Sequence, residues 1–138
     1  MFLEILAKID ELDKVVAVIK ELIASEDTIV ILRGDLASGK TTFVKSFVKN
    51  LGIDELVTSP TFSIQSIYAN TIYHYDVYNK TLEEFISLGL LEEFDKSGVH
   101  FIEWGDEKLE ELLKSYGFKV LVLKIEKRED KRLYIINE

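Results

Sequence analysis

The chain has 138 residues, of which 47% are hydrophobic and 30% are charged, and its formal net charge at pH 7 is −8. This length and composition are typical of one soluble globular domain, and the acidic excess argues against strong direct contact with nucleic acid, which needs clustered lysine and arginine. Since the chain has no cysteine, it has no disulfide, thiolate metal site or thiol nucleophile, and its apolar runs, at most about five residues long, are too short to cross a membrane.

The N-terminal part of the chain predicts a helix that covers a sheet. Charged side chains at Glu4, Lys8 and Asp10 interrupt the first apolar residues, so this segment lacks the apolar core of a signal peptide. Apolar residues then recur at helical spacing through 10–24, with Asp10 as a possible N-cap. We therefore expect a cytoplasmic protein without a membrane contact.

The strongest pattern in the chain follows this helix. Residues 28–32 form an apolar, β-branched run that predicts a buried strand, and apolar residues recur at helical spacing through 43–51. Between them, residues 34–41 match the phosphate-binding pattern G-x-x-x-x-G-K-[ST] at every fixed position. Because the motif requires this strand and helix around it, the segment predicts a nucleoside-triphosphate site rather than a chance glycine turn.

The residue types of this loop suit a triphosphate. Glycines let backbone N–H groups turn inward around phosphates, and the helix start adds its positive dipole end. We expect Lys40 to reach the β- and γ-phosphates and the Thr41 hydroxyl to hold Mg²⁺. The absence of an N-K-x-D element favours ATP over GTP. The other loop residues expected around the phosphates are Asp35, Leu36, Ala37, Ser38 and Gly39.

Residues 57–62 contain the only proline of the chain, which predicts a defined turn rather than a central strand. In P-loop hydrolases a loop at this point can sense the γ-phosphate. Thr58 and Thr61 therefore either serve as such a sensor or belong to an ordinary Ser/Thr/Pro turn.

A β-hairpin is predicted by residues 61–69 and 71–78, which are rich in Tyr, Ile and Thr and flank Asn70. Asp76 shares a strand face with His74, although aspartate is disfavoured in strands. Asp76 either belongs to a solvated face, or orients an attacking water or holds a metal-bound water. His74 either bonds Asp76 or packs in the core.

Two further helices and a strand are expected before residue 118. Residues 81–84 form a capping box that opens a short helix ending at Gly89. Residues 99–103 form an apolar run that ends in Glu103, and Asp106 is placed to cap the next helix. Ligands of open α/β sheets lie at the carboxyl ends of strands, so Glu103 is either the carboxylate of a Mg²⁺ site or a solvent-facing acid.

The C-terminal part predicts strands at 118–125 and 133–136, separated by the charged segment 127–132, which we expect to be an exposed turn. Arg128 and Arg132 either reach a phosphate or a partner, or are simply solvated. These elements predict an α/β protein with a P-loop NTPase-like three-layer fold and a mixed, partly parallel central sheet. We expect residues 1–138 to form a single P-loop ATPase domain.

Five blocks in this order resemble the bacterial TsaE (YjeE) ATPases, which take part in the threonylcarbamoyl modification of tRNA adenosine. The blocks are Gly-Asp-Leu-x-x-Gly-Lys-Thr-Thr at 34–42, Ser-Pro-Thr-Phe at 59–62, His-x-Asp-x-Tyr at 74–78, Leu-Gly-Leu-x-Glu-x-Phe-Asp at 88–95, and Ile-Glu-Trp at 102–104. The resemblance implies an ATPase that docks on a heterodimer of the TsaB and TsaD type, which transfers the threonylcarbamoyl group itself.

The resemblance also implies roles for individual residues. Lys40, Asp76 and Glu103 would serve hydrolysis of ATP, and Thr41 and Glu103 would hold Mg²⁺. The remaining candidates for nucleotide contact are Thr42, which would touch phosphate, Trp104 beside the site, and Arg132.

The chain departs from the family pattern at three places. Ala37 and Ser38 replace the usual Gly-Ala of the loop, and Asn79 stands where an arginine is common. Asp10, Glu11 and Asp13 occupy the region where members often carry Glu-Glu-Thr near the adenine, but the threonine is missing, so the adenine contacts stay unassigned.

Two other functions fit the same motif: a stand-alone P-loop kinase, and a nucleotide-dependent switch that scarcely hydrolyses ATP. A kinase usually needs an arginine-bearing lid and an acceptor pocket. The sequence shows no evident lid, and its only arginines are Arg33, Arg128 and Arg132.

Overall fold

The computed structural model describes residues 2–35, 37–58 and 64–138. Within these residues the chain forms a seven-stranded sheet in the order β1-β7-β6-β2-β5-β4-β3. The strands are β1 (Phe2–Ala7), β2 (Thr28–Arg33), β3 (Gln65–Tyr68), β4 (Ile72–Asp76), β5 (Val99–Glu103), β6 (Val120–Arg128) and β7 (Lys131–Asn137). Strands β6, β2, β5 and β4 are parallel, whereas β1, β7 and β3 pair antiparallel with their neighbours. The predicted mixed, partly parallel sheet is confirmed.

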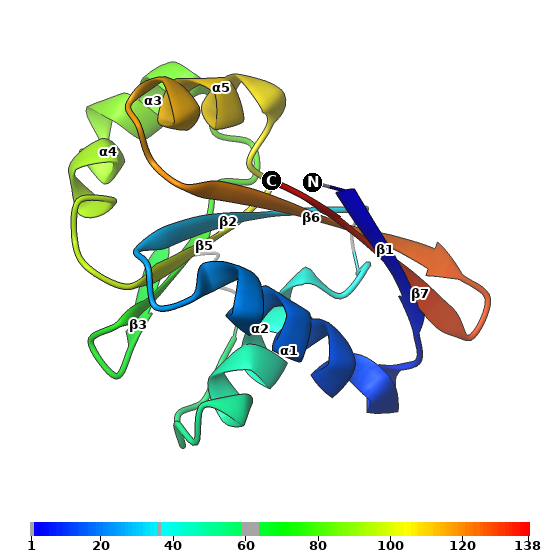
Figure 1. Ribbon diagram of the computed structural model, residues 1–138. Helices are drawn as coiled ribbons and strands as arrows, with labels where there is room; N and C mark the ends of the chain where they lie inside the picture. The colour runs from blue at the N-terminus through cyan, green and yellow to red at the C-terminus, as the bar shows by residue number, and fades with distance from the viewer. Residues whose placement is uncertain (1, 36, 59–63) are drawn as a thin grey trace.

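Helices cover both faces of this sheet, which gives the predicted three layers (Figure 1). On one face lie α1 (Leu12–Ile23), which follows the short 3-10 helix η1 (Ile9–Glu11), and α2 (Lys40–Asn50). On the other face lie α3 (Leu82–Ser87), α4 (Leu90–Glu93) and α5 (Glu107–Ser115). None of the helices in the described part of the chain has the length and apolarity that crossing a bilayer requires.

The pattern of apolar residues explains these layers. Strand β2 lies at the centre with both faces covered, so its residues from Thr28 to Leu32 are all buried. Helix α1 buries a single stripe that includes Val15, Val16 and Ile19. The core therefore divides into two apolar clusters, one on each side of the sheet.

The N-terminal segment differs from the sequence expectation in two ways. Residues Phe2–Ala7 form the edge strand β1, which was not predicted because its apolar residues do not alternate with polar ones, and Phe2, Leu3 and Leu6 are exposed at the edge of the sheet. Asp10 lies within η1, and the residue that precedes α1 is Glu11, whose side chain accepts the backbone N–H of Lys8 rather than an N–H of α1. The prediction of Asp10 as N-cap of the long helix is therefore wrong.

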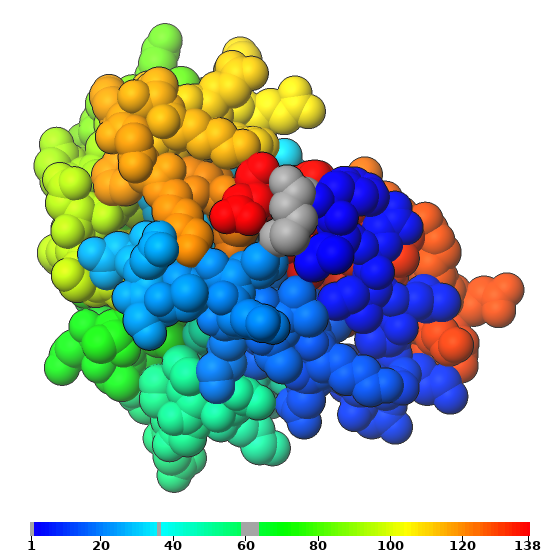
Figure 2. Space-filling view, viewed as in Figure 1, coloured from blue at the N-terminus to red at the C-terminus, as the bar shows by residue number. Residues whose placement is uncertain are grey.

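The charged segment 127–132 is also mostly strand rather than turn. Lys127 pairs with Arg132 and Arg128 with Lys131, so β6 and β7 continue until only Glu129 and Asp130 connect them. Cross-strand pairing thus extends the hairpin through residues whose polarity suggested a loop. Figure 2 shows the N-terminal segment, in blue, against the red and orange C-terminal segment, because β1 pairs with β7.

Strand register decides what lies at the carboxyl edge of the parallel strands. Leu32, just before the phosphate-binding loop, pairs with Glu103 at the end of β5. Glu103 pairs in turn with Asp76 at the end of β4. The loop and both predicted carboxylates therefore reach the same edge of the sheet, where ligands of open α/β sheets bind.

Candidate functional site

The loop between β2 and α2 carries the phosphate-binding motif; one of its residues, Leu36, lies outside the described residues. Gly34 has φ +151°, and a Cβ atom there would lie 2.5 Å from the carbonyl oxygen of Ile125 and 2.5 Å from Oγ of Ser38. Gly39 has φ +115° and precedes the first turn of α2. Both conformations favour glycine, and they bring the loop around a helix N-terminus whose N–H groups have no intrahelical partner.

Ala37 and Ser38 form the middle of this loop. Ala37 has φ +61°, a left-handed conformation that costs a residue with a Cβ atom about 1 kcal/mol. Ser38 is buried against Gly34, and its Oγ has no hydrogen-bond partner in the described part of the chain. The carbonyl oxygen of Ser38 accepts a hydrogen bond from Nε of Arg132 at 3.1 Å. Strand β7 therefore contributes directly to the loop.

Lys40 lies at the start of α2 and is only 4% exposed. Its Nζ donates hydrogen bonds to the carbonyl oxygens of Gly34, at 2.8 Å, and Asp35, at 3.0 Å. The same ammonium lies 3.7 Å from the ring centroid of Trp104, a cation–π contact. Burial lowers the pKa of Lys40, and the negative charge of Glu103 acts in the opposite direction.

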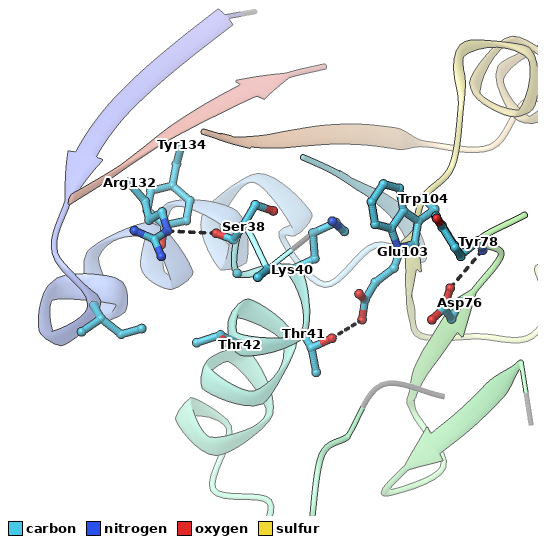
Figure 3. A pocket seen from close by; sticks show the side chains of 13 residues that line it. Ser38, Lys40, Thr41, Thr42, Asp76, Tyr78, Glu103, Trp104, Arg132 and Tyr134 are labelled. Atoms are coloured by element: carbon cyan, nitrogen blue, oxygen red, sulfur yellow. Dashed lines mark hydrogen bonds between the residues drawn. The ribbon is translucent and has the colours of Figure 1, made fainter. Parts of the chain in front are cut away.

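Glu103 is the centre of the polar contacts at this edge of the sheet. Oγ1 of Thr41 donates a hydrogen bond to Oε2 of Glu103 at 2.7 Å (Figure 3). Nε2 of His74 lies 2.5 Å from the same carboxylate oxygen. The sequence left open whether His74 bonds Asp76 or packs in the core; in the structure His74 is fully buried and its imidazole bonds Glu103.

Asp76 lies next to Glu103 in the sheet and is 8% exposed, so it does not belong to a solvated strand face. Its Oδ1 accepts the backbone N–H of Tyr78 at 3.0 Å. The ring of Tyr78 contacts Trp104, with centroids 4.8 Å apart. Trp104 has φ +71°, and its backbone N–H donates to the carbonyl oxygen of Leu32 at 3.2 Å. This hydrogen bond fixes the turn after β5.

These side chains surround a cavity of about 510 Å³, a volume typical of a small-molecule site (Figure 3). The cavity is lined by Ile9, Ala37, Ser38, Gly39, Lys40, Thr41, Thr42, Asp76, Tyr78, Glu103, Trp104, Arg132 and Tyr134. The structure thus brings together residues from the loop, from the ends of β4 and β5, and from β7.

The cavity differs from the predicted site at several positions. Asp35 is exposed and lines a neighbouring groove on another side of Trp104. Ile9, Tyr78 and Tyr134 line the cavity but were not predicted. A signal was present for Tyr78, which belongs to the same sequence block as Asp76, whereas nothing in the sequence placed Ile9 or Tyr134 there.

The proposed γ-phosphate sensor falls largely outside the described residues, which exclude 59–63. Thr58 is described and exposed, but Thr61 is not described. Whether this segment senses the γ-phosphate or forms an ordinary Ser/Thr/Pro turn is therefore not decided by the described residues.

Thr41 and Glu103 have the chemistry of a magnesium site. Both offer oxygen atoms, and their direct contact at 2.7 Å shows that the two groups converge. Mg²⁺ prefers oxygen ligands and commonly takes only one or two from the protein, with phosphates and water completing its shell. The residues present therefore fit Mg²⁺ bound together with a nucleotide phosphate.

Comparison with known proteins gives a consistent match. The family described as "Threonylcarbamoyl adenosine biosynthesis protein TsaE" matches residues 6–134. The tRNA threonylcarbamoyladenosine biosynthesis protein TsaE of Treponema pallidum (strain Nichols) is 46% identical over 90 residues, which cover 63% of this chain and 67% of the relative. The protein of the same name from Bacillus subtilis (strain 168) is 38% identical over 112 residues, covering 79% and 70% of the two chains.

Among solved structures, the crystal structure of YdiB from Bacillus subtilis is similar to this chain. The two superpose with a TM-score of 0.69 and 29% sequence identity, over 99% of this chain and 84% of the other.

Proposed function

We propose an ATPase function for this chain, which belongs to the TsaE family of threonylcarbamoyl adenosine biosynthesis proteins. In this proposal the chain binds ATP with Mg²⁺ and hydrolyses it, and the nucleotide cycle supports the threonylcarbamoyl modification of tRNA adenosine. The observation that carries the proposal is the contact of Thr41 with Glu103 at 2.7 Å, beside the buried ammonium of Lys40.

The loop residues account for binding of the triphosphate. Backbone N–H groups at the start of α2 have no intrahelical partner and can donate to phosphate oxygens. Lys40 can transfer its hydrogen bonds from the carbonyl oxygens of Gly34 and Asp35 to a phosphate. Thr42 and Arg132 line the same cavity, which supports assigning them contacts with the nucleotide.

The carboxylates account for hydrolysis. Thr41 and Glu103 would hold Mg²⁺, which when bound neutralises charge on the phosphate oxygens. Asp76 lines the cavity beside Glu103, and we assign it the orientation of the attacking water. Trp104 forms the wall of the cavity next to Lys40 and limits access of solvent to this corner.

The partners proposed are proteins of the TsaB and TsaD type, and the chain would act in the cytoplasm. A net charge of −8 suits an accessory protein whose partners hold the tRNA, because direct binding of tRNA needs clustered positive charge. In this arrangement the chain does not transfer the threonylcarbamoyl group.

Two measurements test the proposal. Calorimetric titration with ATP and Mg²⁺ should show binding, and labelled ATP should release phosphate to water, faster when the TsaB- and TsaD-type proteins are present. Absence of binding would refute the proposal. Transfer of phosphate to a small acceptor would identify a kinase instead, and binding without turnover, even with both partners, would identify a nucleotide-dependent switch.

A further inference from the structure

We propose that His74 is a positioning residue that holds the Glu103 carboxylate against Thr41, and thereby sets how strongly the site binds Mg²⁺ and how fast ATP is hydrolysed. The inference rests on the proposed function, since it assigns a role toward the same metal-linked carboxylate. His74 lies in the middle of β4, and its side chain is fully buried.

The geometry of the sheet brings His74 to Glu103. His74 pairs with Phe101 on the neighbouring strand β5, so Glu103, two residues further on, lies on the same face as the imidazole. Nε2 of His74 lies 2.5 Å from Oε2 of Glu103, and the same oxygen accepts the Thr41 hydroxyl at 2.7 Å. One carboxylate oxygen is therefore held from two sides, by β4 and by the first turn of α2.

The chemistry of the partners determines the direction of these bonds. An ionised carboxylate can only accept, so Nε2 of His74 carries the proton and donates to Glu103. Nδ1 lies 3.4 Å from the hydroxyl of Tyr68 on β3. Burial raises the pKa of Tyr68, so its phenol keeps a proton that it can donate to Nδ1.

Tyr68 connects this chain of contacts to the segment after α2. Its hydroxyl also interacts with the backbone of Thr58 and the side chain of Ser66. The contacts therefore run from the loop at Thr58 through Tyr68 and His74 to Glu103. Tyr68, His74 and Glu103 are buried, so the orientation of the imidazole, and with it that of the carboxylate, is fixed by the protein rather than by solvent.

The expected effect follows from the freedom that His74 removes. Without the imidazole of His74, Oε2 of Glu103 is held mainly by the Thr41 hydroxyl. The three rotatable bonds of the Glu103 side chain then let the carboxylate move. Groups that orient a metal-linked side chain typically contribute about 10–100-fold to metal affinity or activity. His74→Leu should therefore raise the Mg²⁺ concentration for half-maximal effect, and lower kcat, each by about 10–100-fold.

Two substitutions of different side-chain length separate positioning of the Glu103 carboxylate from packing of the core. In His74→Gln, an amide N–H stands near the position of Nε2, so this variant should recover most of the Mg²⁺ response and of kcat. His74→Asn is too short to reach Glu103 and should behave like His74→Leu. Mg²⁺ dependence is followed by calorimetric titration of ATP and by the fluorescence of Trp104, the only tryptophan of the chain. ATP binding in EDTA should be unchanged in all three variants.

His100→Gln is the matched control, because His100 is the other buried histidine and bonds Tyr75 and the Lys96 carbonyl instead of the site. It should keep the wild-type Mg²⁺ dependence. Wild-type Mg²⁺ dependence and kcat in a folded His74→Leu variant would overturn the inference. If His74→Leu does not fold, equal Mg²⁺ dependence and equal kcat in His74→Gln and His74→Asn would overturn the inference. Failure of the wild-type chain to bind or hydrolyse ATP would instead refute the proposed function.

Discussion

Lys40 is a buried cation that neutral groups of the protein stabilise. Two carbonyl oxygens and the face of Trp104 surround its ammonium. This arrangement offsets the cost of burying a charge, which would otherwise favour the neutral amine. Because the partners are neutral groups, a phosphate can compete with them successfully.

Lys40→Ala should abolish ATP binding in calorimetric titration. Hydrogen bonds to charged groups contribute about 1.5–3 kcal/mol each, so losing two such contacts to phosphate lowers affinity by at least about 100-fold. Lys45→Ala is the control, since Lys45 is exposed on the same helix and lines no part of the cavity. ATP affinity within threefold of wild type in the Lys40 variant would contradict the assignment.

Asp76→Asn should leave ATP binding nearly unchanged and slow hydrolysis. The amide keeps an oxygen that can accept the N–H of Tyr78, so the local backbone is preserved. It removes the negative charge needed to orient or deprotonate water, which typically contributes about 100-fold or more. Single-turnover assays at saturating ATP measure the change, and an unaltered rate would remove Asp76 from the mechanism.

Strands β4 and β5 carry polar side chains in both layers of the protein. On the face toward α2, His74 meets Glu103. On the opposite face, His100 stacks on Tyr73 with ring centroids 4.3 Å apart, and its Nδ1 lies 2.7 Å from the hydroxyl of Tyr75. The alternation of a strand therefore separates a functional histidine from a structural one.

The stability of the fold should fall in acid because of His100. Burial lowers the pKa of His100 below its usual value near 6.5. The neutral form is therefore favoured in the folded state, and the free energy of unfolding is highest above about pH 6.5 and decreases as the pH falls toward the folded-state pKa. Denaturant titrations between about pH 8 and pH 5 measure this slope.

His100→Gln should have a smaller slope over the same pH range, although it is less stable at pH 8. All other titrating groups are common to the two proteins, so the difference reports His100 alone. Equal slopes would show that His100 does not titrate between the folded and unfolded states.

At the scale of the whole molecule, segments near both ends of the sequence contribute residues to the site. Strand β7 brings Arg132 to the carbonyl oxygen of Ser38, although 94 residues separate them. Strand β1 pairs with β7, and Ile9, which follows it, lines the same cavity. The site is therefore completed only when the edge of the sheet has formed.

Arg132→Leu should weaken ATP binding by about tenfold, because one hydrogen bond from a charged group is lost and the loop carbonyl is released. Arg128→Leu is the control on the same hairpin, where the exposed Arg128 bonds Glu126. Calorimetry of both variants tests this, and equal affinities would place Arg132 outside the nucleotide site.

Much of the fold and of the candidate site was predictable because it depends on neighbours along the chain. The glycines lie in one loop, and Lys40 and Thr41 begin the helix that follows it, so the motif lies within one strand–loop–helix unit of clear periodicity. The capping box at Thr81 and the cap at Asp106 are likewise local and are present in the structure. The alternation along β4 correctly placed His74 and Asp76 on the same strand face.

The parts that could not be predicted depend on strand pairing. The sequence did not show that β1 exists, because its apolar residues do not alternate with polar ones and its only neighbour in the sheet is β7. It underestimated the lengths of β6 and β7, since pairing rather than polarity keeps Lys127 and Arg132 in the sheet. It also left open whether His74 bonds Asp76 or packs in the core, and it did not suggest Glu103 as the partner.

By itself, the sequence determined the G-x-x-x-x-G-K-[ST] motif between a strand and a helix, the order of most elements and the family, because spacing over a few residues carries that information. Only the tertiary structure decided that His74 bonds Glu103, 29 residues away, and that Arg132 reaches Ser38. These contacts join distant segments, and the register that brings them together is a property of the assembled sheet rather than of any one strand.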